Sequence, residues 1–571
     1  PVKRPLLALS AAALAALPAA ASAAPEVIVP GVSYERIVRP GPEVVHVIRA
    51  RLSSLVTLEP VLTADTPAKR GTLTGAMRAR LDQGAVAGMN GDYFNLNAAY
   101  PSGILMTGGE LVDEPEPGRT ALVMPPDGRF VAAALQLDGR YQAVDPAGIT
   151  TFPVRTLGGA NRPAERSSET ILYTPRFGPS TPTGGTRADA VIALDAPGAP
   201  LVNAPLAGTV VSTSRSGGSA LGPGQVAITG IGPAAANVAG DLPVGRRLVL
   251  SLSVPAVPPG SQSAIGGGPL LVSGGVPSPL LSLEGFTASQ LDGRTSRSAV
   301  GQRADGMVLL VTAEGPSQGS RGITAAEQAD LMASLGAQTA VGMDSGGSAL
   351  MAVGDRLTIP WPSERPVTDA LVVRYGGVQL PVADKRISPN GDGVGDRLDT
   401  VARAPVPGRL TVTLARRGSG SSRAIVGLDT PGSGAVRVNP LALGLADGPY
   451  DLTAQLVPSD GTPPSSVVRR LVIDRTLGHL QLRKLAAGKG RTVASAAFRL
   501  SRPARVSAVV LSPAGAVVKV LARRAYPAGQ QAVSWDMRLH GAPAAAGRYT
   551  IRVEARTSLG RPSLEGGVTV Q

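Results

Sequence analysis

The segment TAAEQADLMASLGAQTAVGMDSGGS, residues 324–348, predicts a helix, a buried strand and a polar loop in succession. Thr324 with Glu327 three residues later is a capping box, which starts a helix. Gly336 ends that helix because glycine adopts the left-handed C-terminal cap without strain. After an apolar run, Asp344 opens a loop rich in glycine and serine, where a carboxylate and free amides suit a bound ligand. A plain Asp-Gly turn after a strand has the same pattern.

A second segment repeats this order earlier in the chain. Residues 74–81 are predicted to form a helix that ends at Gly84, and residues 85–89 a strand. The sequence NGDYFN, residues 90–95, then supplies polar groups and a glycine at the equivalent place. Two such loops would line one cleft if their strands are neighbours, although two unrelated turns would have the same pattern.

Length and composition predict a secreted protein of several domains. The 571 residues exceed what one hydrophobic core accommodates. Residues 1–23 are predicted to be a signal peptide, because Lys3 and Arg4 precede an apolar run and Ala21-Ser22-Ala23 is a small-residue cleavage site. That run is too short to span a bilayer, and no other stretch is long and apolar enough, so no transmembrane segment is expected. The absence of cysteine excludes disulfides, thiolate metal sites and a cysteine nucleophile.

The formal net charge of +14 is carried mostly by arginine. We predict no nucleic-acid partner, because aromatic residues make up only 3% of the chain and no basic helix or stacking platform stands out. Attraction to an anionic surface, such as cell-wall phosphates or acidic glycans, explains the charge. An arginine-biased, alanine-rich genome explains it equally.

Histidine chemistry is not expected. The chain has three histidines, one in an apolar strand and two near the C-terminal end, so neither a histidine triad nor a histidine-rich zinc site is predicted. No phosphate-binding or dinucleotide-binding glycine motif opens a strand–helix unit. Chemistry in this chain has to depend on carboxylates, arginine, amides and hydroxyls, and no cofactor is required for it.

Strand patterns dominate the chain, with few helices. Residues 24–380 are predicted to form an α+β domain with a large mixed sheet. The sequence ISPNGDGVGD, residues 387–396, resembles the opening of Ig-like modules in secreted bacterial proteins. We therefore expect two all-β Ig-like sandwiches over residues 384–475 and 476–571. The second contains AVSWD, residues 532–536, and AGRYTIRV, residues 546–553, a pairing that resembles the Ig-like domain of flagellar hook-capping proteins.

The start of the first Ig-like module contains a candidate calcium site. Asn390, Asp392 and Asp396 place hard oxygen ligands at alternate positions, which suits calcium. The surrounding helices and the distal glutamate of an EF-hand are lacking. A solvated Asx turn is the alternative interpretation.

Seven motifs occur in the order and spacing of the phosphodiester glycosidase family, over roughly residues 30–378. They are NGDYFN (90–95), IGGGPLLV (265–272), TSRSAVGQ (295–302), LLVTAEG (309–315), RGIT (321–324), MDSGGSALM (343–351) and RPVTDALVV (365–373). That family includes the lysosomal uncovering enzyme, an N-acetylglucosamine-1-phosphodiester alpha-N-acetylglucosaminidase, and bacterial proteins loosely labelled as exopolysaccharide-related. The chain departs from the family pattern at Gly342, where asparagine is usual, and at Ser345, where glycine is usual.

The resemblance implies a secreted hydrolase that cleaves sugar-1-phosphodiesters in a phosphorylated glycan or cell-wall polymer. Asp344 is the expected catalytic carboxylate, Glu314 a second carboxylate, and Asn90 and Asp92 the groups that orient the sugar or water. Arg297 is expected to clamp the phosphate, and Gly346, Gly347 and Ser348 to offer it amides and a hydroxyl. Gly267 is expected to allow a tight backbone approach, and Thr324 to cap a helix whose end can also face an anion. A glycosidase on non-phosphorylated glycans and a non-catalytic wall- or glycan-binding protein remain alternatives.

Overall fold

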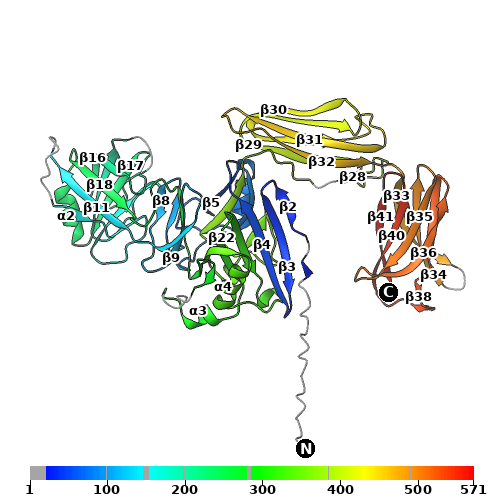
Figure 1. The fold of residues 1–571 in the computed structure, drawn as a ribbon, viewed down its shortest axis with the longest axis horizontal. Helices are drawn as coiled ribbons and strands as arrows, with labels where there is room; N and C mark the ends of the chain where they lie inside the picture. The colour runs from blue at the N-terminus through cyan, green and yellow to red at the C-terminus, as the bar shows by residue number, and fades with distance from the viewer. Residues whose placement is uncertain are drawn as a thin grey trace, which may run out of the picture. The chain divides into compact units, whose positions relative to one another are not determined.

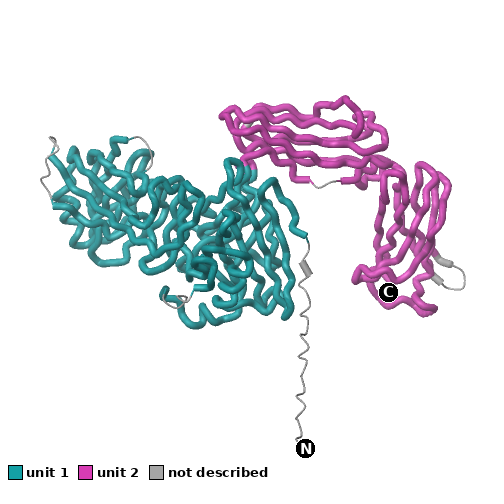
Figure 2. The backbone as a smooth tube through the Cα atoms, in the orientation of Figure 1, with its two compact units in different colours: residues 1–81, 85–375 teal, residues 82–84, 376–571 magenta. Residues whose placement is uncertain are grey.

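A computed structural model describes residues 21–22, 24–97, 99–145, 153–196, 200–278, 284–382, 385–487 and 491–570. The chain forms two compact units, one of residues 1–81 and 85–375 and one of residues 82–84 and 376–571 (Figure 2). Apart from residues 21–22, the predicted signal peptide lies outside the described residues. Within the described ranges, no helix combines the length and the apolar character that crossing a bilayer requires.

The first unit contains four sheets (Figure 1). The nine-stranded sheet has the order β1 (Ala21–Ser22), β3 (Val32–Arg39), β4 (Glu43–Arg51), β23 (Met307–Ala313), β22 (Arg297–Arg303), β24 (Ala337–Gly342), β20 (Leu270–Ser273), β21 (Val276–Pro277), with β2 (Glu26–Val29) beside β3. The β6 sheet has the order β26 (Arg356–Leu357), β25 (Met351–Val353), β6 (Ala85–Asn90), β27 (Asp369–Tyr375), β5 (Val56–Leu62).

The other two sheets come mostly from the middle of the chain. The β9 sheet has the order β10 (Val131–Ala134), β9 (Thr120–Met124), β19 (Ser263–Gly266), β7 (Leu105–Thr107), β8 (Glu110–Asp113). The eight-stranded sheet has the order β12 (Arg155–Thr156), β11 (Asp138–Val144), β18 (Arg247–Ser253), β16 (Pro205–Ser214), β15 (Arg187–Leu194), β17 (Gln225–Ile231), β14 (Glu169–Tyr173), β13 (Gly159–Ala160). These two sheets share one apolar core.

The nine-stranded sheet and the β6 sheet pack face to face. Ile48 and Val300 from the first and Met89 and Leu371 from the second belong to the same buried core. Helix α4 (Ala325–Ser334) covers the outer face of the nine-stranded sheet, and α1 (Leu73–Ala79) covers that of the β6 sheet. Two further helices are α2 (Ala234–Asp241), which packs on β15 and β17, and the short α3 (Ala288–Asp292). The loops at the ends of β6 and β24 therefore leave from two packed sheets.

The helix signals predicted from the sequence are confirmed. Thr324 caps α4, and the reciprocal hydrogen bonds of a capping box join it to Glu327. Gly336 has a φ of +87°, the left-handed conformation expected at the end of that helix. Thr72 caps α1 through a hydrogen bond from the Gly75 amide.

The prediction of an α+β domain with one large mixed sheet is correct only in part. The unit is mostly β and has several sheets. Its described strands pair antiparallel, except for the short pair β13 and β14. Neighbours such as β22 and β23 are joined by tight turns, which antiparallel pairing allows, whereas parallel neighbours need long crossovers that are usually helical. A chain with so few helices cannot supply many such crossovers.

The second unit is all β and contains sandwich-like sheets, as predicted. One sheet has the order β28 (Lys385–Ile387), β32 (Ser465–Ile473), β31 (Gly448–Pro458), β29 (Leu398–Arg416), β30 (Ser422–Val438). Two more sheets share a core around Trp535: β33 (Leu477–Ala487), β34 (Arg491–Leu500), β37 (Gly529–Trp535), and β36 (Val517–Tyr526), β35 (Ala504–Leu511), β40 (Gly547–Arg556), β41 (Ser563–Val570). A two-stranded ribbon, β38 (Arg538–Leu539) and β39 (Ala542–Pro543), completes it.

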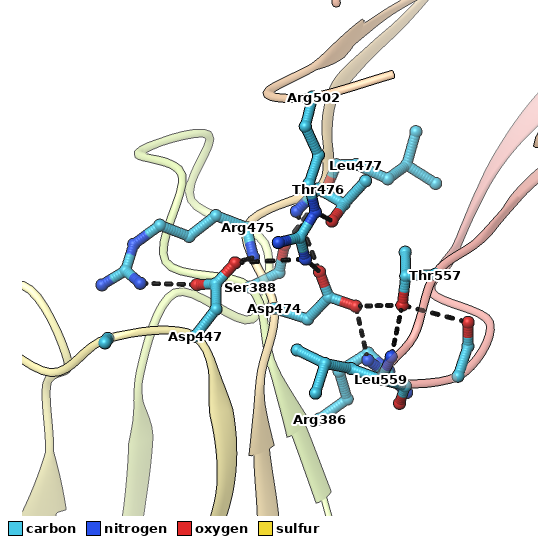
Figure 3. Close-up of polar contacts among 12 residues, drawn as sticks. Arg386, Ser388, Asp447, Asp474, Arg475, Thr476, Leu477, Arg502, Thr557 and Leu559 are labelled. Carbon is cyan, nitrogen blue, oxygen red and sulfur yellow. Dashed lines mark hydrogen bonds and ion pairs between the residues drawn. The ribbon is translucent and has the colours of Figure 1, made fainter. Parts of the chain in front are cut away.

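Asp474 joins the two halves of the second unit (Figure 3). Its side chain is fully buried and accepts hydrogen bonds from Arg386 at 2.8 Å, Arg502 at 3.1 Å and Thr557 at 3.0 Å. Arg386 lies in β28 of the first β-module, whereas Arg502 follows β34 and Thr557 follows β40 in the second. One carboxylate therefore contacts both β-modules. Burial alone would raise the pKa of Asp474, but the hydrogen bonds from Thr476 and Thr557 and the charge of Arg386 outweigh it and lower that pKa.

We predict that Asp474→Ala destabilises the second unit by about 3 kcal/mol, because removing one partner of a buried charge network leaves the others unpaired. Calorimetric melting of the full chain measures this, and trypsin should cut faster near residue 475. The control is Arg437→Ala, whose side chain is 82% exposed and pairs with Asp399 only at 4.0 Å. Equal melting of the two variants would show that Asp474 does not stabilise the joint.

Candidate active site

The two polar loops predicted from the sequence lie side by side. Asn90 is the last residue of β6, and Asp344 follows β24 after one residue. The Asp344 amide donates to the Gly91 carbonyl at 3.0 Å, and Asn90 Nδ2 donates to the Asp344 carbonyl at 2.9 Å. Residues more than 250 positions apart in the sequence therefore form one site.

The side chain of Asn90 is buried and makes four hydrogen bonds within the protein. Nδ2 donates to the carbonyls of Gly91 and Asp344. Oδ1 accepts from Ser298 Oγ at 2.7 Å and from the Leu350 amide at 2.9 Å. Both donors and both acceptor positions of the amide are used. Asn90 thus ties β6 to β22 and to the Asp344 loop.

Asp344 presents a half-buried carboxylate. Burial raises its pKa to about 6, with a further upward contribution from Asp92, while hydrogen bonds from Ser348 and from the Ser345 amide and the charge of Arg365 oppose the rise. The Ser345 amide donates to Oδ1 at 2.8 Å. A carboxylate with this pKa is ionised in most molecules at neutral pH and can still take up a proton.

Two fully buried carboxyls, Asp92 and Asp369, lie behind Asp344. Burial and the neighbouring Asp92 raise the pKa of Asp369 to about 8, and burial also raises the pKa of Asp92. Asp369 Oδ1 accepts from the Asp92 amide at 2.7 Å. It occupies the space that a Cβ on Gly91 would need. At neutral pH Asp369 therefore holds its proton while Asp344 is ionised, a separation of pKa values typical of catalytic carboxyl groups.

Arg119, which the sequence analysis did not single out, partners Asp92. Its Nη2 donates to Asp92 Oδ1 and to the Gly267 carbonyl, both at 2.7 Å. Its guanidinium lies over the rings of Tyr93, at 4.9 Å, and Phe286, at 5.5 Å. Asp92 Oδ2 has no hydrogen-bond partner among the described residues. No motif surrounds Arg119 in the sequence, so only the packing of β9 against β19 places it here.

Tyr93 was also missed, although it lies inside the NGDYFN motif. Its ring is half-buried and packs on Phe286 at 5.4 Å. Burial raises its pKa, and the negative charge of Asp344 adds to the rise. Within the part of the chain that the structure describes, its hydroxyl has no hydrogen-bond partner. That hydroxyl is free to contact a ligand beside Asp344.

Arg297 and Arg365 differ in how they are bound. Arg297 is buried, and its Nε and Nη2 donate to four main-chain carbonyls, those of Gln290, Leu291, Gly293 and Ile323. This leaves Nη1 for the predicted phosphate contact. Arg365 is exposed, packs on Gly347 and donates through Nη1 to Ser348 Oγ at 3.4 Å. No carboxylate within the described residues forms an ion pair with Arg365.

The remaining predicted site residues have defined structural partners. Glu314 is buried and paired with His46 Nε2 at 2.8 Å, so it is not a residue of an exposed surface turn. Thr324 forms the helix cap described above. Gly267 lies where a Cβ would meet the Gly342 carbonyl and the Met343 side chain, so the expected tight backbone approach is to a neighbouring strand. Of the predicted set, the structure groups Asn90, Asp92, Asp344 and residues 346–348.

The candidate calcium ligands are occupied by backbone amides. Asp396 Oδ1 accepts from the amides of Asn390 and Gly391, both at 2.9 Å. The two oxygens of Asp392 accept from the amides of Val394, at 2.9 Å, and His479, at 2.6 Å. The bond from Val394 is that of an Asx turn, whereas the others join Asp396 to the start of its own loop and Asp392 to His479. In the described part of the chain, no cluster of three or more acidic or histidine side chains could hold a metal.

Two stretches of the chain match known families. Residues 202–374, which include Asp344 and Arg365, match the phosphodiester glycosidase family. Residues 484–558 match the FlgD Ig-like domain, the domain of hook-capping proteins. The chain carries a phosphodiester glycosidase domain followed by an FlgD Ig-like domain. The resemblance predicted from the motifs is confirmed.

Known proteins are similar to parts of the chain. The SPbeta prophage-derived uncharacterized protein YomE of Bacillus subtilis is 37% identical over 91 residues, which are 16% of this chain and 14% of that protein. A hypothetical protein from Synechocystis is 22% identical with a TM-score of 0.49, over 61% of this chain and 62% of that one. The catalytic domain of zebrafish N-acetylglucosamine-1-phosphodiester alpha-N-acetylglucosaminidase is 11% identical with a TM-score of 0.31, over 62% of this chain and 84% of that one.

We predict that Gly91→Ala destabilises the phosphodiester glycosidase domain by about 1–3 kcal/mol, the usual cost of overpacking. The added Cβ would overlap Asp369 Oδ1 and lie 2.7 Å from Ile265 Cδ1. Calorimetric melting of the full chain measures the loss. The matched control is Gly178→Ala, where an added Cβ meets no atom within 4 Å. If both variants melt like the parent, Asp369 does not pack against Gly91.

We predict that Asp369→Asn becomes more stable relative to the parent as the pH rises from 5 to 8. The folded pKa of about 8 lies above the ordinary value of 3.8, so the folded parent holds a proton that the unfolded chain has released. Asp369 therefore costs the parent up to about 1.4 kcal/mol per pH unit across this window, and the variant lacks this contribution. Melting temperatures at pH 5, 6.5 and 8 test this, with Asp330→Asn, an exposed carboxyl on α4, as control. A pH-independent difference would contradict the prediction.

Proposed function

We propose that this chain is a hydrolase that cleaves the glycosidic bond of sugar-1-phosphodiesters. The observation that carries the proposal is that, inside the phosphodiester glycosidase domain, the titratable carboxylate of Asp344 shares a loop with Ser348, whose hydroxyl accepts from Arg365, a guanidinium with no ion pair among the described residues. At such a bond, a carboxylate can stabilise charge on the sugar carbon or activate water, and an arginine can bind the phosphate oxygens.

In the proposed reaction, water attacks the anomeric carbon and the bond from that carbon to the phosphate oxygen breaks. The bonding electrons leave with the phosphate, so the products are a free sugar and a phosphate monoester. Since that monoester is a stable anion, its departing oxygen needs less protonation than an ordinary sugar hydroxyl. The proton lost by water passes to a base and then to solvent. The reaction therefore requires one carboxylate, as a base or an electrostatic stabiliser, and a set of groups that bind the phosphate.

Asp344 is the group proposed for the carboxylate role. It is the least buried of the site's three aspartates, and its pKa of about 6 leaves it ionised at neutral pH. It either accepts the proton of the attacking water or stabilises positive charge on the anomeric carbon. The protonated carboxyl of Asp369 behind it adds no second negative charge that would weaken this effect.

The phosphate cradle is assigned to the Asp344 loop and Arg365. Arg365 already touches Ser348 Oγ and packs on Gly347, so its guanidinium lies along the loop. Arginine suits a phosphate because its planar fork matches two oxygens at once. The Tyr93 hydroxyl, which has no partner within the described residues, can add a further hydrogen bond.

We further propose that the protein acts outside the cell, on a phosphorylated glycan or cell-wall polymer. The predicted signal peptide supports export, and the net charge of +14 supports attraction to an anionic polymer. The Ig-like modules then serve as a spacer or as adhesion units for that surface.

The deciding experiment is phosphorus NMR of the full chain with a diester of N-acetylglucosamine-1-phosphate and a second sugar. We expect the parent to convert the diester signal to a monoester signal. Asp344→Asn should lose at least about 100-fold in rate, the usual contribution of a positioned acid or base. Asp330→Asn, an exposed carboxyl elsewhere in the domain, should match the parent. The parent's rate should fall as the pH drops through about 6, because Asp344 is then protonated.

Each other outcome has a distinct meaning. Equal conversion by the parent and Asp344→Asn would keep the reaction but contradict the role of Asp344. No conversion of the diester, with hydrolysis of a non-phosphorylated glycan, would favour an ordinary glycosidase. No hydrolysis of either substrate would favour a glycan-binding protein.

A further inference from the structure

A basic groove of about 640 Å³ opens beside the candidate active site. Lys69, Arg70 and Arg365 supply its cations, and Leu96 and Pro366 supply apolar surface. We call it the Arg70 groove. Arg365 lines the groove and also contacts the Ser348 hydroxyl of the Asp344 loop. The groove is thus continuous with the site through one guanidinium.

The cations of this groove are held in place by the backbone. The Gly71 amide donates to the Val367 carbonyl at 3.1 Å, and the Val367 amide donates back to the Gly71 carbonyl at 2.9 Å. This antiparallel bridge lies one residue from Arg70 and two residues from Arg365, and both arginines line the groove. The guanidinium of Arg70 lies 5.5 Å from the ring of Phe94, which fixes it over the NGDYFN loop. Two segments that carry positive charge therefore contribute to one groove.

These charges are poorly neutralised by the protein itself. Within the described residues, Arg70 and Arg365 form no ion pair. Lys69 reaches Asp65 only at 4.0 Å, with both side chains largely exposed. By contrast, Arg321 is paired with both Glu43 and Glu327. Exposed cations gathered without acidic partners in a concave surface attract an anion.

We propose that the Arg70 groove binds a second anionic group of the substrate, one unit beyond the bond that is cleaved. The substrate class is then a polymer whose sugars or polyols are joined by successive phosphodiester links, in preference to a single diester. The apolar surface of Leu96 and Pro366 suits the carbon skeleton between two phosphates. This inference rests on the proposed function, because it places that skeleton on the leaving-group side of Asp344.

The test is binding of a fluorescent pentamer of N-acetylglucosamine joined by phosphodiester links, measured by anisotropy with the full chain. Asp344→Asn is the background for every variant, so that the probe is not consumed. Lys69→Gln with Arg70→Gln should bind the pentamer about tenfold more weakly than the background. Arg166→Gln with Arg215→Gln removes the same charge from exposed positions elsewhere in the first unit and should bind like the background. Added salt should weaken background binding more than binding by the groove variant.

Three results would overturn the proposal. The first is equal affinity of the groove variant and the control variant for the pentamer. The second is equal binding of the neutral, phosphate-free pentasaccharide. The third is that the groove variant loses binding only to phosphatidylglycerol vesicles, which would assign the groove to a membrane surface. Groove-dependent pentamer binding without hydrolysis by the parent would instead refute the proposed function and leave the groove as a binding site for a phosphodiester polymer.

Discussion

The buried side chain of Asn90 is the constraint on which the site depends. Its four hydrogen bonds connect the end of β6 to Ser298 on β22 and to the backbone at Asp344 and Leu350. Leaving a buried amide without a hydrogen-bond partner costs more free energy of folding than an average hydrogen bond contributes. The loop therefore has one low-energy position over the two sheets, and that position fixes the direction of the Asp344 carboxylate. Asn90 acts here by positioning other groups.

Behind that loop, burial of carboxyl groups sets the charge of the site. Asp92 and Asp369 lie in a small space because glycines at positions 91, 103 and 266 have no side chains that would occupy it. Loss of water disfavours their charged forms, and Arg119 compensates only for Asp92. The outermost carboxyl, Asp344, consequently ionises at lower pH than Asp369. Because Asp344 is less buried than Asp92 and Asp369, its ionised carboxylate lies at the surface of the site.

The sequence predicted the local features of this site well. The capping box at Thr324, the stop at Gly336 and the two polar loops depend on short-range rules, and the structure has each of them. The class of sheet and the partners of buried charges depend on which strands become neighbours, which spacing alone does not encode. Arg119 reaches Asp92 only because β9 lies beside β19, and Glu314 meets His46 because β23 pairs with β4.

Asp369 and Arg365 were missed for a different reason. Both lie in RPVTDALVV, a motif that was recognised, but its pattern predicts only a buried strand. Asp369 begins β27, next to Asn90 in the β6 sheet, so its carboxyl enters the site through strand register. That register depends on which apolar faces meet, a property of the assembled sheet.

The arginines show why net charge says little about binding. Arg297 and Arg119 donate most of their hydrogen bonds to main-chain carbonyls and to Asp92, so their main effect is to stabilise the shape of the site. Arg365 and Arg70 are exposed, and among the described residues neither has an acidic partner. A guanidinium in that state keeps its attraction for an incoming anion, because no protein carboxylate has to be displaced. A ligand-binding arginine is therefore distinguished by the lack of an acidic partner, and two such arginines line the Arg70 groove.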